Sequence, residues 1–267
     1  MEVWQIILIA VGSLIGFVLS LAILYVIVVA IAAACVNPNR NYDKVSGFYR
    51  ALLMIGGWAC MTIGRIKIKV NGEDKLPDGE FLLVQNHRSN FDPIVTTYAL
   101  HKRKIAFISK VENFSIPLFG RIIRKMCFMP IDRENPREAM KTILRGADLM
   151  KRGAASVAVY PEGTRNKSAE GLLPFHNGVF KMAQRASVPV VVTTVVGTEN
   201  IHKNFFRRRS IINIDIAEVI PADRVKAEGS GEIGDYARSV IARNLGVNPE
   251  APADNSTTPE PTLDRTR

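Results

Sequence analysis

Charge is nearly absent from the start of the chain, and cysteine is scarce throughout it. The 267 residues include 35 Lys and Arg against 25 Asp and Glu, a net charge of +10, yet Glu2 is the only charged residue before Arg40. The three cysteines stand far apart, at Cys35, Cys60 and Cys127. That spacing excludes a disulfide framework and a four-thiolate zinc site, and it fits a reducing compartment. A mean hydropathy of +0.08 excludes a disordered chain, a collagen-like repeat and a multi-span transporter.

The uncharged stretch over residues 3–36 is almost entirely apolar. At about 1.5 Å per residue, roughly 20 residues cross a ~30 Å hydrocarbon core, so this run can span a membrane even when tilted. It lacks the basic start of a signal peptide and the polar face of a surface helix. We therefore expect residues 1–40 to be a membrane anchor. Arg40, Lys44 and Arg50 follow it, so the positive-inside rule predicts a catalytic domain on the cytoplasmic side of an inner or plasma membrane.

Three further regions follow the anchor. Residues 41–64 contain a second apolar stretch that is short for a span, and it fits an interfacial helix and an ordinary core helix equally well. Residues 65–245 form the main domain. Residues 246–267 are rich in Pro, Asp, Glu and Thr without apolar periodicity, which predicts a disordered tail.

Short apolar runs alternate with amphipathic segments in the main domain. We expect strands at 65–70, 81–84, 106–109, 156–160, 188–196 and 211–220. Asn135, Pro136 and Glu138 predict the start of a helix that ends at Gly153. This alternation predicts an α/β fold with a central mixed, largely parallel sheet flanked by helices. In such sheets, sites gather at the carboxyl ends of the strands.

A polar segment, residues 85–93 (QNHRSNFDP), follows the second expected strand. His87 and Asp92 would lie about 140° apart on a single helix, so they can meet only if His87 ends the strand and Asp92 begins the next helix. A carboxylate beside an imidazole fixes the tautomer of the ring and raises its basicity, which is the arrangement of a general base. The alternatives are a structural histidine and an Asp92 that caps the helix, with Pro93 in its first turn.

A second polar segment, residues 160–166 (YPEGTRN), follows the expected strand at 156–160. Arg165, the Thr164 hydroxyl and backbone N–H groups near Gly163 can hold a phosphate. The alternative is a solvated turn with an ion pair between Glu162 and Arg165.

These two segments, NHRSNFD at 86–92 and YPEGTR at 160–165, resemble the first and third motifs of the glycerolipid acyltransferases, and of their 1-acyl-glycerol-3-phosphate acyltransferase group in particular. Residues 131–133 (IDR) and 188–191 (VPVV) resemble the second and fourth motifs, and PFHNG at 174–178 resembles the family's Pro-Phe-x-x-Gly stretch. The resemblance covers about residues 65–220 and the anchor. Cys127, Pro130 and the absence of a second proline in the fourth motif depart from the family pattern, which weakens inference about the acceptor and the acyl chain.

The resemblance implies a membrane-bound enzyme that transfers an acyl chain from a thioester to the free hydroxyl of 1-acyl-glycerol-3-phosphate, giving phosphatidic acid. It implies His87 as general base, oriented by Asp92. The candidate substrate-binding residues are Asn86, Ser89, Arg133, Glu162, Gly163, Thr164 and Arg165, with Arg133 and Arg165 as phosphate ligands. Acyl-CoA or an acyl carrier protein is the co-substrate, membrane lipids and the lysophospholipid acceptor are the partners, and neither cofactor, metal nor nucleic acid is expected.

Other functions stay open at this stage. The same chemistry on glycerol-3-phosphate or another lyso-phospholipid fits the motifs equally well. A non-catalytic lipid-binding protein would not need His87 and Asp92, and a hydrolase would need a nucleophile motif such as G-x-S-x-G, which is absent. Basic clusters at 102–104, 121–125 and 207–209 could bind anionic headgroups or an acidic carrier protein, and Phe205-Phe206 fits an interfacial anchor or an ordinary loop.

Overall fold

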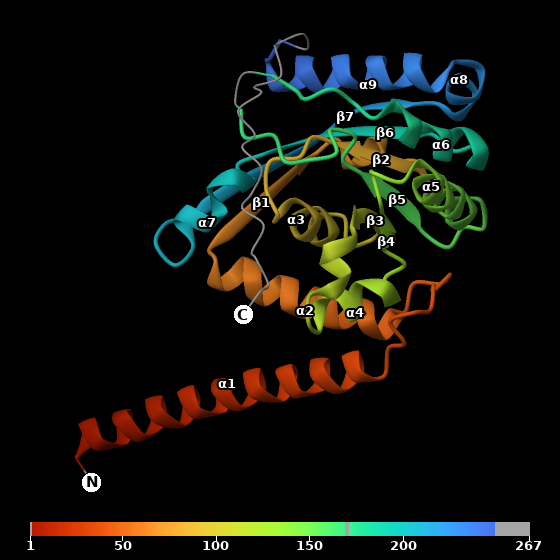
Figure 1. Ribbon diagram of the computed structural model, residues 1–267. Helices are drawn as coiled ribbons and strands as arrows, with labels where there is room; N and C mark the ends of the chain where they lie inside the picture. The colour runs from red at the N-terminus through yellow and green to blue at the C-terminus, as the bar shows by residue number, and fades with distance from the viewer. Residues whose placement is uncertain (1, 169–170, 249–267) are drawn as a thin grey trace, which may run out of the picture.

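A seven-stranded sheet with helices on both faces forms the body of the protein. The computed structural model describes residues 2–168 and 171–248. The strands are β1 (Ile66–Asn71), β2 (Leu82–Gln85), β3 (Ile105–Lys110), β4 (Met129–Ile131), β5 (Ser156–Val159), β6 (Val190–Val196) and β7 (Ser210–Ile220). The helices are α1 (Val3–Ala34), α2 (Gly47–Ile63), α3 (Asp92–Ala99), α4 (Phe119–Lys125), α5 (Pro136–Lys151), α6 (Lys181–Ala186), α7 (Ile201–Asn204), α8 (Ala222–Ala227) and α9 (Ser230–Leu245). Helix α9 lies over one face of the sheet, and α2, α3 and α4 lie on the other side (Figure 1).

The sheet is mixed and largely parallel, as the sequence predicts. Its order is β1-β7-β6-β2-β5-β3-β4. The five strands from β6 to β4 run in one direction, and β7 pairs antiparallel with β6 while β1 pairs parallel with β7. The carboxyl ends of β2, β4, β5 and β6 therefore meet at one edge of the sheet.

The central strands read as continuous apolar runs because they are covered on both faces. Every residue of β2 and of β5 is buried, whereas β1 alternates between buried or half-buried and exposed positions. Unbroken burial is typical of a central parallel strand, and alternation is typical of a strand with one solvated face. The polar segments that follow β2 and β5 therefore start from rigid supports.

The six expected strands are all present, and one strand was missed. Strand β4 is only three residues long and contains Pro130, which has no N–H to donate. It pairs with β3 at the end of the sheet, where proline is tolerated. The predicted helix start is confirmed, because the Asn135 side chain accepts hydrogen bonds from the backbone N–H groups of Arg137 and Glu138.

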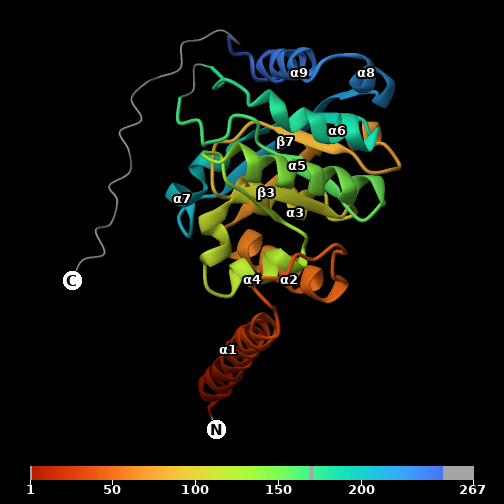
Figure 2. The ribbon, with the colours of Figure 1, turned by 45° about the vertical axis from the view of Figure 1, so that its right-hand side comes forward.

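Helix α1 extends away from the body and is apolar on all sides (Figure 2). Among the described residues it is the one helix long and apolar enough to cross a membrane. Its last third packs on the body: the Tyr25 hydroxyl donates to Leu52 O at 3.0 Å, and the Tyr49 hydroxyl donates to Ala32 O at 2.8 Å.

Helix α2 has both buried and exposed apolar side chains. Leu52 is buried against Ala32 and Ala33 of α1, and Met61 is buried in a cluster with Val95 of α3. Other large apolar side chains of α2 are exposed, namely Phe48, Ile55, Trp58 and Ile63. Neither description from the sequence, a core helix or an interfacial helix, covers both sets alone.

The first three residues of the predicted tail, residues 246–248, are among the described residues. Gly246 ends α9 with a positive φ of 68°, and Asn248 forms an isolated bridge with Gly171. The remainder of the predicted tail, residues 249–267, lies outside the described residues.

Candidate active site

His87 and Asp92 meet at the carboxyl edge of the sheet. Strand β2 ends at Gln85, and α3 begins at Asp92, so the chain turns between the two side chains. The Nδ1 atom of His87 lies 2.8 Å from Oδ2 of Asp92. Because an ionised carboxylate only accepts, Nδ1 carries the proton and Nε2 keeps a lone pair.

Asp92 does not cap α3. The capping position belongs to Phe91, and the Asp92 carboxylate turns back toward the preceding loop. Its Oδ2 atom also accepts from the backbone N–H groups of Arg88 and Ser89, each at 2.8 Å. The cap alternative is therefore wrong, since this fully buried carboxylate holds the turn that carries His87.

Tyr160 is a site residue that the sequence analysis missed. Its ring stacks on the His87 imidazole, with centroids 4.1 Å apart and planes 14° apart. Its buried hydroxyl faces the Thr96 side chain, and Oδ1 of Asp92 is buried without a hydrogen-bond partner in the described part of the chain. Burial and the nearby Asp92 charge raise the pKa of Tyr160 well above its usual range, so the phenol stays neutral. The sequence signal that could have identified Tyr160 was its position directly after a buried strand that pairs with β2.

Glu162 links the two polar segments from behind His87. Its Oε1 accepts from the His87 backbone N–H at 2.9 Å, and its Oε2 accepts from Leu173 N–H at 3.1 Å. The Asn166 backbone N–H in turn donates to the His87 carbonyl at 2.7 Å. Both carboxylate oxygens of Glu162 thus hold the protein's own backbone, and the side chain is 3% exposed.

Asn86 and Ser89 also face the protein. The Asn86 side chain donates to Val195 O at 2.9 Å and accepts from Val195 N–H at 2.8 Å, which ties the segment after β2 to β6. The Ser89 hydroxyl oxygen accepts from the Phe91 N–H at 3.2 Å. These contacts support the His87 loop, and substrate binding by Asn86 and Ser89 stays a prediction.

Arg133 and His176 converge on Gly163. A Cβ atom built on Gly163 would lie 2.7 Å from the His176 ring and 3.8 Å from Arg133 Cζ, and Gly163 has a φ of 73°. Glycine is therefore required both by its backbone conformation and by the side chains facing it. Thr164 is exposed and Arg165 half-buried on the same loop. His176 was named in the sequence only as part of the PFHNG stretch, because nothing in that spacing shows which side chain it faces.

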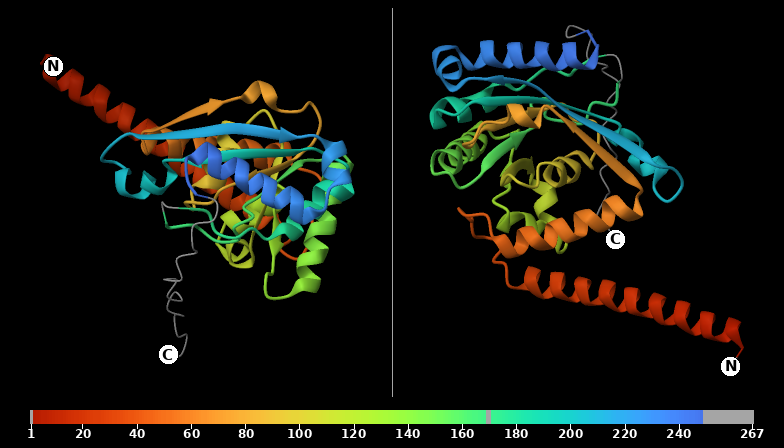
Figure 3. Two further views of the ribbon diagram at one scale, coloured as in Figure 1. Left: turned by 90° about the horizontal axis from the view of Figure 1, so that it is seen from above. Right: turned by 180° about the vertical axis from the view of Figure 1, so that it is seen from behind.

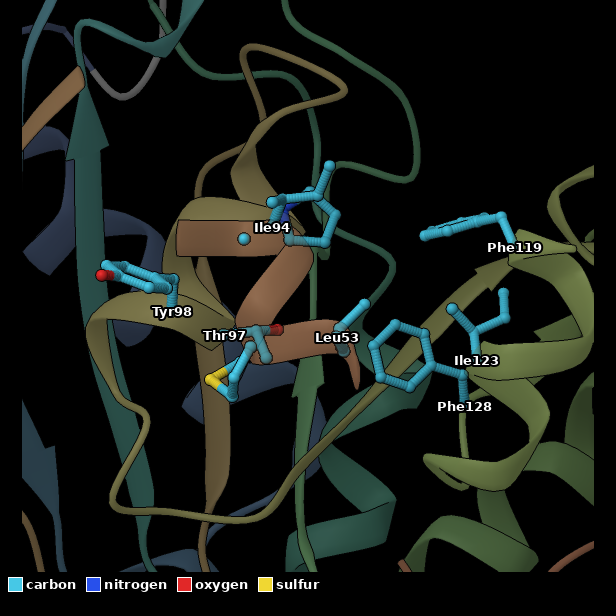
Figure 4. A pocket seen from close by; sticks show the side chains of 10 residues that line it. Leu53, Ile94, Thr97, Tyr98, Phe119, Ile123 and Phe128 are labelled. Carbon is cyan, nitrogen blue, oxygen red and sulfur yellow. The ribbon is translucent and has the colours of Figure 1, made fainter. Parts of the chain in front are cut away.

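An apolar pocket lies among the helices that cover this side of the sheet, and neither His87 nor Asp92 is among its lining residues. Its walls come from α2, α3, α4 and the chain after α4 (Figure 4), and Pro93 and Ile94 directly follow Asp92. The lining residues are Leu53, Met54, Gly57, Pro93, Ile94, Thr97, Tyr98, Phe119, Ile123 and Phe128.

Together these features define an α/β protein that has a histidine–carboxylate pair at the carboxyl edge of its sheet, beside the loop that begins at Tyr160. Residues 67–196 match the protein family described as Acyltransferase. This part of the chain is therefore similar to that family, and the resemblance seen in the motifs is confirmed.

Three relatives show how far the likeness extends. The chain is 34% identical over 193 residues to a chloroplastic 1-acyl-sn-glycerol-3-phosphate acyltransferase of Brassica napus, covering 71% of this chain and 54% of that protein. It is 27% identical to the 1-acyl-sn-glycerol-3-phosphate acyltransferase of Escherichia coli, covering 86% of this chain and 92% of that one. The crystal structure of the 1-acyl-sn-glycerophosphate acyltransferase of Thermotoga maritima superposes with a TM-score of 0.57 at 22% identity, covering 73% of this chain and 80% of that one, and shows the same fold. The chain spans about half the length of the plant proteins that it matches.

We predict that Glu162→Gln lowers the free energy of unfolding by about 1–3 kcal/mol, because an amide N–H₂ would face a backbone N–H in the buried site.

The effect of this substitution depends on pH, because burial raises the pKa of Glu162 above 4.5. Between 4.5 and the native pKa, the unfolded chain releases this proton while the folded protein retains it. The stability of the wild type relative to the Gln variant therefore falls as pH rises through this window. Denaturant unfolding in detergent across the window measures it, and a difference that grows with pH would contradict the assignment.

Proposed function

We propose that this protein transfers a fatty acyl chain from a thioester donor to the free hydroxyl of 1-acyl-glycerol-3-phosphate, which yields phosphatidic acid. The observation that carries the proposal is the 2.8 Å contact between His87 Nδ1 and Asp92 Oδ2, which leaves Nε2 as a base. The names of the relatives point to the same acceptor.

In this reaction, Nε2 of His87 removes the proton of the acceptor hydroxyl as its oxygen attacks the thioester carbonyl carbon. The C–S bond then breaks, and the departing thiolate takes the proton back from the imidazolium. Asp92 stabilises the imidazolium through Nδ1, and the face of the Tyr160 ring lies against it. The acyl chain passes directly from sulfur to oxygen.

A covalent acyl-cysteine is not part of the proposal. Cys127 is fully buried, and burial raises the pKa of its thiol to about 11, so the thiol stays protonated near neutral pH. The buried thiol belongs to the apolar core of the domain rather than to the site.

The two substrate ends would have different environments. Arg133 and Arg165, with Thr164 and the backbone at Gly163, would bind the acceptor phosphate, because guanidinium groups match phosphate geometry. The apolar side chains that line the small pocket among α2, α3 and α4 would contact the acyl chain. Acyl-CoA or an acyl carrier protein would supply the thioester, and no cofactor takes part.

Helix α1 would anchor the protein in the membrane, and the exposed apolar side chains of α2 would lie at its surface. Arg40, Lys44 and Arg50 place the catalytic domain on the cytoplasmic side in this proposal. The lipid acceptor would then reach the site from the bilayer.

We predict that His87→Ala lowers kcat by at least about 10²-fold, because the acceptor hydroxyl loses its base. The measurement is the mass of the product formed from 1-acyl-glycerol-3-phosphate and acyl-CoA or acyl carrier protein donors. Glycerol-3-phosphate and other lyso-phospholipids serve as competing acceptors in the same assay. An unchanged circular dichroism spectrum controls for folding, and near-normal turnover by the folded variant would remove His87 from this role.

We predict that Arg133→Ala and Arg165→Ala raise KM for the phosphate-bearing acceptor about ten-fold or more and leave KM for the acyl donor nearly unchanged. Arg137→Ala is the matched control, because Arg137 is exposed at the start of α5 and its substitution removes the same charge. Equal effects on the two substrates would argue against phosphate binding by these arginines.

We predict that Tyr160→Phe and Tyr160→Leu behave differently. Tyr160→Phe keeps the stacked ring and removes a buried hydroxyl whose polar neighbour is the Thr96 side chain, so the free energy of unfolding changes by about 1 kcal/mol or less and kcat changes little. Tyr160→Leu removes the ring face from the imidazolium and lowers kcat about ten-fold with KM unchanged. Thermal unfolding and steady-state kinetics test both, and a Tyr160→Phe variant that loses much more stability than this would contradict the first prediction.

A further inference from the structure

The loop that joins α7 to β7, residues 205–209, holds an aromatic side chain out from the protein. We call it the basic loop. Phe206 is 73% exposed and has a φ of 65°, a left-handed conformation that is strained for a bulky residue. The carbonyl of Asn204 accepts from the N–H groups of Arg207 and Arg208, at 2.8 and 2.9 Å, which fixes the turn. The loop is therefore shaped to present Phe206 rather than to bury it.

The positive charge of the basic loop is not compensated nearby. Arg207, Arg208 and Arg209 are consecutive and exposed. None of the ion pairs found within residues 2–168 and 171–248 involves any of the three. Three adjacent guanidinium groups around an exposed phenyl ring form a surface that is both cationic and apolar.

The basic loop lies against the end of α2. A Cβ atom built on Gly64 would lie 2.7 Å from Cε2 of Phe205, so the two segments are in contact. Figure 1 and the right-hand view of Figure 3 both show α7 and the basic loop at the end of the molecule where α2 leads into β1. Ile63 and Trp58 of α2 are 55% and 59% exposed. The ring of Phe206 lies edge-on to that of Phe205, with centroids 4.7 Å apart, so this exposed ring is next to the residue that packs on the end of α2.

The basic loop is also connected to the candidate active site. The ring of Phe205 lies 6.4 Å from that of Phe91, centroid to centroid, in a stacked arrangement. Phe91 stands between His87 and Asp92 in the polar segment, and β6, which leads into α7, is hydrogen-bonded to Asn86 through Val195. A ligand on the basic loop would therefore sit beside the turn that carries the histidine.

We propose that the basic loop binds the headgroups of anionic phospholipids at the bilayer surface, with Phe206 inserted among the lipids. The guanidinium groups would pair with lipid phosphates, and the ring would take the apolar level just below them. An acidic carrier protein would also meet the arginines. A bilayer is favoured because Phe206 is exposed next to Phe205, which packs on the end of α2, and α2 also exposes Trp58 and Ile63. This inference rests on the proposed membrane placement and not on the proposed reaction.

The test follows the environment of position 206 directly. Phe206→Trp is made in a background with Trp4→Phe and Trp58→Phe, because these are the chain's two tryptophans. The full chain is placed in nanodiscs of phosphatidylcholine, with or without phosphatidylglycerol, that carry brominated acyl chains. We expect a blue-shifted emission and strong quenching in the anionic discs. Emission typical of an indole in water, without quenching in either disc, would overturn the proposal.

A charge variant and a matched control complete the experiment. Each basic side chain near an anionic surface strengthens association about five-fold, so Arg207→Gln, Arg208→Gln and Arg209→Gln together should reduce quenching to its level in neutral discs. The control removes the same charge from exposed positions on α5 and α6 through Arg137→Gln, Lys151→Gln and Lys181→Gln, and it should leave quenching unchanged. Equal losses in both sets would reduce the effect to net charge and overturn the proposal. A fluorescence change that requires an acidic carrier protein instead of anionic lipid would also overturn the proposal. Because the readout is fluorescence, it is independent of acyl transfer.

Discussion

The arrangement of the site depends on one buried charge, the carboxylate of Asp92. A carboxylate removed from water is costly unless donors surround it. Here one oxygen receives the His87 ring N–H and two backbone N–H groups at 2.8 Å each. Forming these bonds bends the chain between β2 and α3 and fixes the orientation of the imidazole. The same interaction thus shapes the turn and prepares the proposed base.

Other polar groups hold that turn in place from the neighbouring strands. Glu162 reaches the His87 backbone from the loop after β5, and Asn86 ties the turn to β6. Because β2, β5 and β6 are adjacent and parallel, their carboxyl ends bring these groups together without long connections. The side chains that would meet substrate in this proposal are exposed at Arg133 and Thr164 and half-buried at Arg165. The polar residues of the motifs therefore have two roles. Those whose hydrogen-bond partners lie in the protein hold the turn, and the others would contact substrate.

Sequence reasoning predicted the parts of the site that follow from local order along the chain. A buried run, a turn and an Asp-Pro helix start were sufficient to predict that His87 and Asp92 could meet. Sequence reasoning did not predict side-chain contacts that depend on packing between segments distant in the chain. The stacking of Tyr160 on His87, the approach of His176 to Gly163 and the inward direction of Glu162 each depend on how two loops fit together. Strand β4 was missed because three residues with a central proline carry too little pattern. The assignment of Asp92 as a cap was wrong because three donors in the preceding loop compete with the helix N-terminus.

The most direct test of this account is the tautomer of His87. The chain has four histidines, so selective ¹⁵N-histidine labelling of the full-length protein in detergent gives few NMR signals. The two ring-nitrogen signals of His87 are assigned by their loss in His87→Asn. When the His87 ring is neutral, the account predicts a proton on Nδ1 and none on Nε2. Finding the proton on Nε2 would contradict it, because the nitrogen that faces the acceptor could then no longer act as a base.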